Sequence, residues 1–313
     1  AGVEHVVLAT SYRAEVFEAY FGDGADLGLR IDYVTETQPM GTGGGIRNVA
    51  ERLESKPDDP VLIFNGDVLS GHDLTGQLDL HANRAADVTL HLVEVEDPRA
   101  FGCVPVDDEQ RVTAFIEKSD QPVTNRINAG CYVFARRVID AIPAGRPVSV
   151  ERETFPGLLD SGATVLGYVE TAYWLDVGTP AAFVQGSADV VRGVLPSPAM
   201  PGAPGDALIL GDAVVDAAAV VHGGAVVGAG ARVGREAEVD GAVVGDNARI
   251  EPGAVVVRSV IGDGAVVGPG TVVRDAVIGD EARLGAGIEL AYGARVWPEV
   301  ALADGAVRFS SDV

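Results

Sequence analysis

This chain of 313 residues has little cysteine, little lysine and no long apolar run, and each shortage excludes a class of protein. Its two cysteines, Cys103 and Cys131, offer neither a disulfide framework nor a zinc site, which suits a reducing cytoplasm. No stretch approaches the roughly 20 apolar residues of a membrane-spanning helix. No signal peptide is visible either, because the first apolar run, Val6 to Leu8, is too short. With 23 basic against 46 acidic residues the net charge is −23, which repels nucleic acid polymers and anionic lipid.

Lysine is the scarcer of the two strong cations, occurring only at Lys56 and Lys118 against 21 arginines. In a chain that almost always uses arginine, a lysine inside a motif indicates that a compact ammonium group is wanted there. Lys56 lies next to Pro57 in a polar loop, where we attribute it to chance. Lys118 lies in a motif that is described below.

Residues 5 to about 192 alternate short β-rich runs with amphipathic stretches. The predicted strands are His5–Ala9, Leu29–Thr35, Val61–Asn65, Asp87–Val95, Gly102–Val106, Val112–Glu117, Ile127–Phe134, Thr164–Val169 and Tyr173–Asp176. The predicted helices are Ser11–Phe21, Gly45–Glu54, Leu74–Arg84, Arg136–Ile142, Arg152–Asp160 and Pro180–Arg192. Strands that alternate with helices predict an α/β, Rossmann-like domain with a mixed, mainly parallel sheet covered on both faces.

The opening residues Ala1-Gly2-Val3 are typical of a helix C-terminus with a glycine stop. A strand follows at once, so we expect the first βα unit of the domain to precede Ala1. Roughly 40 residues would hold one such unit and its loop. The alternative is a natural short form.

A stretch rich in proline and glycine marks a domain boundary. The run from Gly193 to Gly205 holds four prolines and three glycines, the composition of a stiff linker. We therefore assign residues 1–193 to the α/β domain, 194–206 to the linker, and 207–313 to a second domain with a C-terminal tail.

The second domain is an internal repeat with a period of six residues. Aliphatic residues recur at 209, 215, 221, 227, 233, 239, 244, 250, 256, 261, 267, 273, 278, 284, 290 and 296. Two positions before them stands a small residue, alanine in thirteen cases and Ser259 and Thr271 in two more, with Ile288 as the exception. Such a period suits a triangular β-solenoid, in which three hexapeptides form one coil and the aliphatic side chains stack inside. Three steps of five residues shorten the middle coils to 17 residues. The pattern resembles the hexapeptide repeat of left-handed parallel β-helices, here with roughly five coils.

Two aspartates end predicted strands. Asp67 closes the apolar strand Val61–Asn65, and Asp176 closes Tyr173–Asp176 just before a helix that begins at Pro180. Open α/β sheets bind ligands at the carboxyl ends of their strands. Two carboxylates there could hold one Mg²⁺ that bridges the phosphates of a nucleotide. Either aspartate alone could instead be a turn or helix-cap residue.

A glycine-rich segment, Gln38–Gly45, precedes a predicted helix and would let backbone N–H groups approach a ligand closely. It matches neither a Walker A motif nor a dinucleotide fingerprint, so a flexible loop is the alternative. Glu36, just before it, could accept hydrogen bonds from N1–H and N2–H of a guanine. A glutamine would suit thymine or uracil better.

A third group of polar residues lies at the end of one later strand and at the beginning of the next. The ammonium of Lys118 could contact a sugar phosphate, and Glu117 could accept from sugar hydroxyls, although a surface ion pair is the alternative. Asn128 offers both a donor and an acceptor to a sugar, and Gly130 allows its close approach.

The histidines show no catalytic arrangement. His72, His81 and His91 lack ligand spacing, and His222 is alone on a predicted coil, so we interpret all four as surface or packing residues. No Ser–His–Asp or Cys–His pattern emerges.

These motifs, in this order, resemble the sugar-nucleotide pyrophosphorylase family, and within it most closely the mannose-1-phosphate guanylyltransferase group. The resemblance takes in Pro39–Gly45, Asn65-Gly66-Asp67, Phe115–Lys118, Asn125–Gly130, a Ser-x-Glu-x-x-x-Phe-Pro segment at Ser149–Pro156, Trp174–Pro180, the hexapeptide domain and the closing Phe309–Val313. It covers nearly the whole chain. There are two departures: Ser119 stands where the family usually has proline, and the family's opening glycine-rich signature with its essential arginine is absent. We therefore expect these 313 residues alone to be inactive.

The resemblance implies a nucleotidyltransferase domain followed by a left-handed β-helix. It implies an enzyme that makes a nucleotide sugar, GDP-mannose first, and pyrophosphate from GTP and mannose 1-phosphate. The implied roles are Mg²⁺ binding for Asp67 and Asp176, catalysis for these two with Lys118, nucleotide binding for Glu36, Pro39, Gly41, Thr42 and Gly66, and sugar phosphate binding for Glu117, Asn128 and Gly130. We expect the protein to be cytoplasmic. We also expect it to be a homo-oligomer, because the end coils of a solenoid need covering. Nucleic acid and membrane are not expected partners.

Other functions stay open at this point. One is a non-catalytic regulatory homologue that binds a nucleotide sugar, against which the intact Asp67, Lys118 and Asp176 argue. Another is the same reaction with glucose 1-phosphate and UTP, dTTP or ATP. The third is an acetyltransferase in the β-helix, which rests on fold analogy alone.

Overall fold

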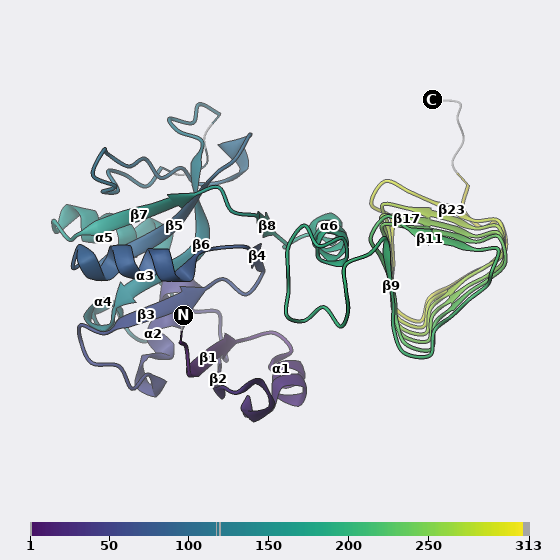
Figure 1. Ribbon diagram of the computed structural model, residues 1–313, viewed down its shortest axis with the longest axis horizontal. Coiled ribbons are helices and arrows are strands. Elements are labelled where there is room, and N and C mark those ends of the chain that lie inside the picture. The colour runs from purple at the N-terminus through teal and green to yellow at the C-terminus, as the bar shows by residue number, and fades with distance from the viewer. Residues whose placement is uncertain (1, 117, 119, 309–313) are drawn as a thin grey trace. The chain divides into compact units, whose positions relative to one another are not determined.

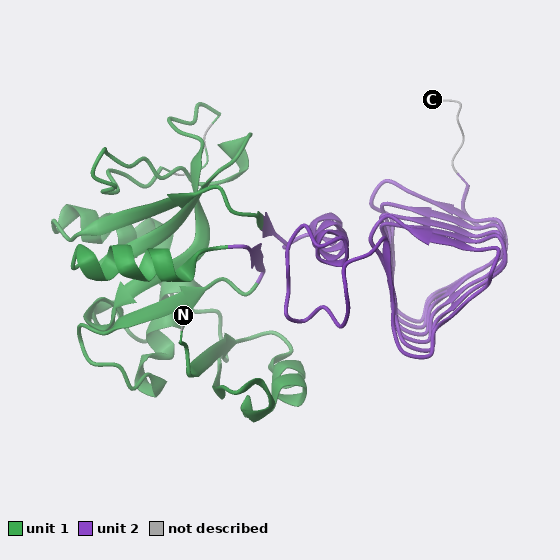
Figure 2. Ribbon diagram, viewed as in Figure 1, with its two compact units in different colours: residues 1–66, 72–174 green, residues 67–71, 175–313 purple. Residues whose placement is uncertain are grey.

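The computed structural model describes residues 2–116, 118 and 120–308. The chain divides into two compact units, residues 1–66 with 72–174 and residues 67–71 with 175–313 (Figure 2). Each unit takes two segments of the chain, and strand β4 (Val68–Ser70) pairs with strand β8 (Trp174–Asp176). The helix that follows β8 is grouped with the second unit, whereas the sequence placed the domain boundary after that helix. None of the helices in the described chain is long and apolar enough to cross a membrane.

The first unit is built around a four-stranded mixed sheet of order β3-β6-β5-β7 (Figure 1). Its strands are β3 (Pro60–Phe64), β5 (Val88–Glu94), β6 (Arg126–Ala135) and β7 (Val165–Glu170). Strand β6 is antiparallel to β3 and β5, while β5 and β7 are parallel, so three strands share one direction and β6 opposes them. A separate parallel pair is formed by β1 (His5–Thr10) and β2 (Arg30–Thr35).

The helices of this unit lie where the sequence predicts them, to within a few residues, with one exception given below. They are α1 (Ala14–Phe21), α2 (Gly41–Asn48), α3 (Leu74–Asn83), α4 (Arg136–Ala141) and α5 (Phe155–Asp160), with 3-10 turns at Ala25–Leu27, Ala50–Arg52 and Pro98–Ala100 and a π turn at Val150–Thr154. Strands β5 and β6 are buried over almost their whole length, because the sheet is covered on both faces. Tyr132 and Phe134 of β6 pack their rings against Phe155 of α5 in the core.

Two sequence predictions are wrong in this unit. Residues 41–45, expected as a loop, form the first turn of α2. Gly102–Val106 and the described part of Val112–Glu117 form isolated bridges rather than strands, at Cys103 with Ile116 and at Val106 with Val112. The Asp107 carboxylate accepts from two backbone N–H groups and closes a tight turn between the two runs, so they pair over single residues only.

His81 of α3 is a buried core histidine, as the packing interpretation expects, and it makes stability depend on pH. It is 5% exposed, and its Nδ1 lies 3.0 Å from Thr89 Oγ1. Burial, helped by the Arg137 charge and opposed by Asp87, lowers the pKa of His81 below its ordinary value of 6.5. Below that pH the unfolded chain therefore binds more protons at this residue than the folded chain, and folding stability falls as the pH falls.

We expect the stability advantage of the wild-type protein over His81→Gln to shrink between pH 7 and pH 5. Urea unfolding of both proteins across this range measures it. Curves of unfolding free energy against pH that run parallel for the two proteins would contradict the assignment.

The second unit contains β4, α6 (Pro180–Val191) and a parallel β-helix. The β-helix has three sheets (Figure 1). The first sheet holds β10 (Val214–Val215), β13 (Arg232–Val233), β16 (Arg249–Ile250), β19 (Val266–Val267), β22 (Arg283–Leu284) and β25 (Ala301–Leu302). The second holds β11 (Val220–His222), β14 (Glu238–Asp240), β17 (Val255–Val257), β20 (Val272–Arg274) and β23 (Glu289–Leu290). The third holds β9 (Ala207–Ile209), β12 (Ala225–Val227), β15 (Val243–Val244), β18 (Val260–Ile261), β21 (Val277–Ile278) and β24 (Arg295–Val296).

The coil length follows the spacing of the repeat in the sequence. In the middle coils Val243 pairs with Val260 and Val260 with Val277, one coil of 17 residues each time. The aliphatic positions of the repeat point inward and are almost fully buried there, and the small residues before them are buried as well. Corners turn through left-handed backbone: Gly230, Asn247, Gly264, Glu281 and Glu299 have φ between 56° and 66°.

Candidate functional site

The two aspartates predicted to hold a metal ion lie close together in the second unit. Asp67 precedes β4 and Asp176 ends β8, and Val177 N–H donates to Asp67 O at 2.8 Å beside this strand pair. A methyl group on Gly178 would lie 2.9 Å from Asp176 Oδ1 and 3.9 Å from Asp67 Oδ2. The two carboxylate oxygens are therefore within about 7 Å of each other, a separation that one partly hydrated cation can bridge. Both side chains are exposed, so a substrate can reach them.

The first turn of α2 is docked on residues 148–151 of the first unit. Gly43 and Gly44 N–H groups both donate to Val148 O, at 2.8 and 3.2 Å, and Val148 N–H donates to Met40 O at 2.8 Å. A methyl group on Gly43 would lie 2.9 Å from the Val148 side chain. The glycines therefore allow the close approach of two backbones, and these contacts hold the segment helical despite its low propensity.

The Ser-x-Glu motif at 149–151 forms the other half of this contact. Thr42 Oγ1 accepts from Val150 N–H at 3.0 Å and donates to Glu151 Oε2 at 3.0 Å. Ser149 Oγ donates to the same Glu151 oxygen at 2.8 Å. Two motifs that are a hundred residues apart in the sequence are thus one structural element, and Thr42 has a structural role that the sequence did not predict.

Glu36 lies at the N-terminus of α2. Its Oε2 accepts from Met40 N–H at 3.2 Å, and a methyl group on Gly45 would lie 2.9 Å from its Oε1. A carboxylate at this end of a helix is stabilised by the helix dipole. Pro39 and Gly66, the other residues predicted to bind the nucleotide, are exposed.

Position 41 is the one in this segment where a residue other than glycine is least tolerated. Its φ is 69°, and a methyl group there would lie 2.6 Å from Val148 O. Left-handed backbone costs a residue with a side chain about 1–2 kcal/mol, and the contact with Val148 adds to this cost. We expect Gly41→Ala to lower the free energy of unfolding by about 2 kcal/mol. Urea denaturation measures the change.

Gly157→Ala is the matched control for Gly41→Ala. Gly157 lies in α5, and a methyl group there has nothing within 4 Å. This variant should be neutral or more stable by about 0.5–1 kcal/mol. Equal effects of the two substitutions would contradict the assigned role of Gly41.

Two predicted sugar-binding residues lie together on β6. Asn128 Nδ2 donates to Tyr132 OH at 2.8 Å, and Asn128 Oδ1 accepts from Gly130 N–H at 3.1 Å. Gly130 has φ of 78°, and its O accepts from Asn65 N–H at 2.8 Å. A methyl group on Gly130 would lie 2.9 Å from Asn65 Nδ2. The structure thus adds Asn65 to this group.

Lys118 and Glu117 are the remaining predicted residues. Lys118 is exposed. Glu117, like the closing Phe309–Val313 segment, lies outside the described residues.

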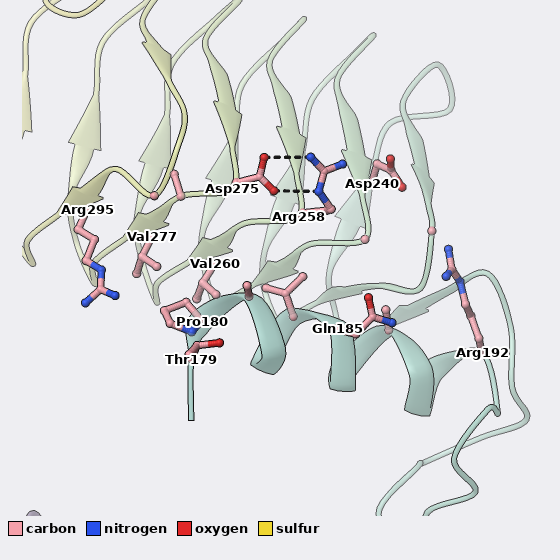
Figure 3. Close-up of a pocket in the computed structure, with 17 residues that line it drawn as sticks. Thr179, Pro180, Gln185, Arg192, Asp240, Arg258, Val260, Asp275, Val277 and Arg295 are labelled. Atoms are coloured by element: carbon pink, nitrogen blue, oxygen red, sulfur yellow. Dashed lines mark hydrogen bonds and ion pairs between the residues drawn. The ribbon is translucent and has the colours of Figure 1, made fainter. Parts of the chain in front are cut away.

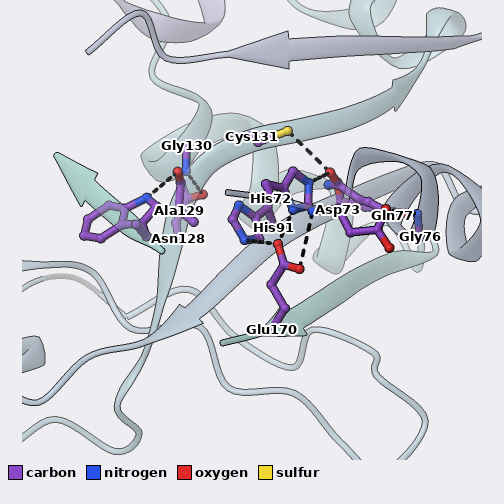
Figure 4. Close-up of polar contacts among 12 residues, drawn as sticks. His72, Asp73, Gly76, Gln77, His91, Asn128, Ala129, Gly130, Cys131 and Glu170 are labelled. Atoms are coloured by element: carbon purple, nitrogen blue, oxygen red, sulfur yellow. Dashed lines mark hydrogen bonds and ion pairs between the residues drawn. The ribbon is translucent and has the colours of Figure 1, made fainter. Parts of the chain in front are cut away.

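A cluster that the sequence analysis missed lies in the first unit (Figure 4). His72 and His91 stack with their ring centroids 3.8 Å apart, and Glu170 Oε1 contacts His72 Nδ1 and lies 2.9 Å from His91 Nε2. Burial, with the neighbouring His72 as second cause, lowers the pKa of His91 to about 3. His91 and Glu170 come from the neighbouring strands β5 and β7, and His72 from the loop before α3. The one signal in the sequence is His91 itself, a polar residue in an apolar strand.

The second unit also has a groove of about 520 Å³ between α6 and the β-helix (Figure 3). Val260 and Val277 of the β-helix and Pro180 of α6 line its apolar part, and Arg258 pairs with Asp275 at its rim through two hydrogen bonds of 2.8 and 2.9 Å. As far as the described chain extends, none of the residues predicted for the site lines this groove.

Comparison with known proteins identifies two family matches. The family described as "Nucleotidyl transferase" matches residues 1–193, and the family described as "GMPPB C-terminal domain" matches residues 203–307.

Individual proteins are similar over different shares of the chain. A "Mannose-1-phosphate guanylyltransferase" of Mycobacterium tuberculosis is 58% identical over 100% of this chain and 87% of its own length. A "Mannose-1-phosphate guanyltransferase" of Gibberella zeae is 35% identical over 60% of this chain and 51% of its own. Among solved structures, HddC from Yersinia pseudotuberculosis has a TM-score of 0.50 and 25% identity, over 59% of this chain and 77% of that one. A second structure of HddC, complexed with GMP-PN, has the same TM-score and 26% identity.

Proposed function

We propose that this chain makes GDP-mannose and pyrophosphate from GTP and mannose 1-phosphate. The premise is that the chain belongs to the nucleotidyl transferase family. The observation that carries this proposal is the 58% identity, over the whole chain, to a mannose-1-phosphate guanylyltransferase. Family membership confirms the predicted fold class, an α/β nucleotidyltransferase domain followed by a parallel β-helix, and the predicted class of enzyme.

In the proposed reaction a phosphate oxygen of mannose 1-phosphate attacks the α-phosphorus of GTP. One P–O bond forms, the bond between the α-phosphorus and the bridging oxygen breaks, and pyrophosphate leaves with that oxygen. No covalent intermediate with the protein is needed, so the work of the protein is positioning and charge neutralisation. Lys118, one of the two lysines in this acidic chain, is proposed to contact the sugar phosphate.

The carboxylates of Asp67 and Asp176 fit a divalent cation. Two exposed oxygen donors within about 7 Å suit Mg²⁺, which takes one or two carboxylates and fills its other positions with water and phosphate oxygens. Bound there, Mg²⁺ would neutralise negative charge on the reacting phosphates. The metal assignment and the identity of the ion are proposals.

The nucleotide and sugar residues are proposed from their local contacts in the first unit. Glu36 uses Oε2 for Met40 N–H, which leaves Oε1 to accept from a guanine. The Asn128 amide donates one hydrogen bond to Tyr132 and accepts one from Gly130, so a second N–H and a second lone pair can meet sugar hydroxyls. Gly130 and the nearby Asn65 would complete this surface.

A substrate panel tests the proposal. Pyrophosphate release should be measured on the complete natural protein with GTP, UTP, dTTP and ATP, each combined with mannose 1-phosphate and glucose 1-phosphate. We expect GTP with mannose 1-phosphate to give the highest kcat/KM. A higher value for glucose 1-phosphate with another nucleotide would establish the alternative specificity. Nucleotide sugar binding without turnover of any pair would establish a regulatory homologue.

We also propose that the protein is a homo-oligomer in a reducing compartment. Ile209, at an inward position of the first coil, is 42% exposed, whereas Val227 one coil later is fully buried. The end coil therefore leaves apolar surface for a second chain to cover. Light scattering of the purified protein tests the oligomer.

The proposed reducing compartment rests on the cysteines. Both are buried free thiols, as a reducing cytoplasm would allow.

A further inference from the structure

We propose that His72, His91 and Glu170 bind a first-row transition metal ion, for which Zn²⁺ is the probe. One ligand atom from each residue lies within 4.8 Å of the others. Two imidazole nitrogens and a carboxylate oxygen are the donor set of many zinc sites. This site is distinct from the pair of exposed aspartates in the second unit, which offers oxygen donors only.

The hydrogen bonds around His72 direct its Nδ1 towards the carboxylate. Gln77 Nε2 donates to Thr89 O at 2.8 Å, which turns Gln77 Oε1 towards His72 Nε2 at 2.7 Å. Because that oxygen can only accept, His72 carries a proton on Nε2. An outer hydrogen bond of this kind fixes the tautomer of metal-binding histidines. The Nδ1 lone pair then faces Glu170, and two facing lone pairs require a proton or a cation between them.

A proton held between His72 and Glu170 would leave the ring nitrogens of His91 without a partner. Its side chain is 1% exposed, and among the described residues neither ring nitrogen has a hydrogen-bond partner. Nε2 lies 2.9 Å from Glu170 Oε1 without the alignment of a hydrogen bond. A buried polar group without a partner is costly, and such groups often face a bound ion or an ordered water molecule. A cation shared with Glu170 would give this nitrogen a partner.

An irregularity in the sheet positions His91 next to His72 and Glu170. The pairing of β5 with β6 shifts register between Leu90 and Leu92, so His91 lies at a bulge opposite the left-handed Gly130. Bulges redirect side chains and are common next to functional sites. Glu170 is at the end of β7, and its Oε2 accepts from Asp73 N–H at 3.5 Å, which helps to hold the carboxylate in place.

Two of the three ligands are close in the sequence to the strands β4 and β8, whereas His91 lies within β5. His72 follows β4 in the sequence, and Glu170 precedes β8. Ligand atoms around a tetrahedral ion are about 3.3 Å apart, given bonds of about 2.0 Å. The carboxylate and the stacked rings would therefore move apart slightly when the ion enters.

Zinc binding to the chelator-treated, complete protein tests the proposal. Titration should be carried out calorimetrically with excess Mg²⁺ present, which occupies oxygen-only sites. We expect one Zn²⁺ per chain and a rise in the melting temperature on its addition. His91→Gln and Glu170→Gln should each weaken binding at least 100-fold. His222→Gln is the control, because this half-buried histidine also has acidic neighbours, Glu238 and Asp240.

A spectroscopic readout keeps the test decisive if a variant fails to fold. Co²⁺ added to the wild-type protein should give the visible absorption of a tetrahedral nitrogen and oxygen site. Absence of these bands together with absence of stoichiometric Zn²⁺ binding would overturn the proposal and leave a proton shared by His72 and Glu170. Loss of binding in His222→Gln, with none in His91→Gln, would also overturn it. Because binding is measured without turnover, its failure does not affect the proposed transferase activity.

Discussion

Replacing Asp176 by asparagine in the complete natural protein should lower kcat/KM for GTP and mannose 1-phosphate roughly 1,000-fold. The carboxylate lies at the end of β8, within reach of the Asp67 carboxylate and open to solvent. Loss of one negative ligand would weaken the binding of the proposed cation. The charge stabilisation that such a cation would supply is worth several kcal/mol in phosphoryl transfer, and about 1.4 kcal/mol corresponds to a tenfold change in rate. Pyrophosphate release at saturating and limiting Mg²⁺ measures the effect.

A surface aspartate provides the matched control for Asp176→Asn. Asp108→Asn makes the same chemical change at an exposed turn in the first unit, and its activity should stay within twofold of the wild type. Higher Mg²⁺ concentrations should recover part of the activity of Asp176→Asn, because the remaining carboxylate of Asp67 would still bind the cation, although with lower affinity. Turnover of Asp176→Asn within a few-fold of the wild type would show that the metal assignment is wrong.

Replacing Val267 by aspartate should unfold the β-helix or lower its melting temperature by about 10 °C or more. Val267 is fully buried in the stack of aliphatic side chains inside the coils. A carboxylate there has no partner and cannot reach water, which places the cost above about 4 kcal/mol, the range of severe substitutions. In a unit of this size each kcal/mol is worth about 2–4 °C. Thermal unfolding followed by circular dichroism measures the shift.

The neighbouring residue of the same strand tests whether the side of the sheet decides the outcome. Val266 faces outward on β19 and pairs with Arg249 on one side and Arg283 on the other. Val266→Asp should therefore be close to neutral, because opposite charges on adjacent strands stabilise a sheet by about 0.2–1 kcal/mol. Similar melting temperatures for the two variants would contradict the inward and outward assignment.

Much of the fold was predictable because its signals are local. The period of six residues places every inward aliphatic position, and the three steps of five residues predict coils of 17 residues, which the strand pairing confirms. Most strands and helices of the α/β unit also follow from alternation of their residues. The candidate site was predictable only as far as it uses strand ends. Asp67 and Asp176 were proposed in this way, although the short strand β4, whose pairing with β8 brings them close together, was not predicted.

Tertiary contacts decided the rest. The glycine run at 41–45 has the composition of a loop, and it is helical because residues 148–151 supply backbone partners from a distant part of the chain. The cluster of His72, His91 and Glu170 has no spacing that a sequence pattern could detect, since a bulge in β6 opposite His91 and the parallel pairing of β5 with β7 bring it together. The physical reason is the same in each case. Periodicity records which side of its own element a residue faces, whereas the partner that it meets there is set by pairing between segments far apart in the chain.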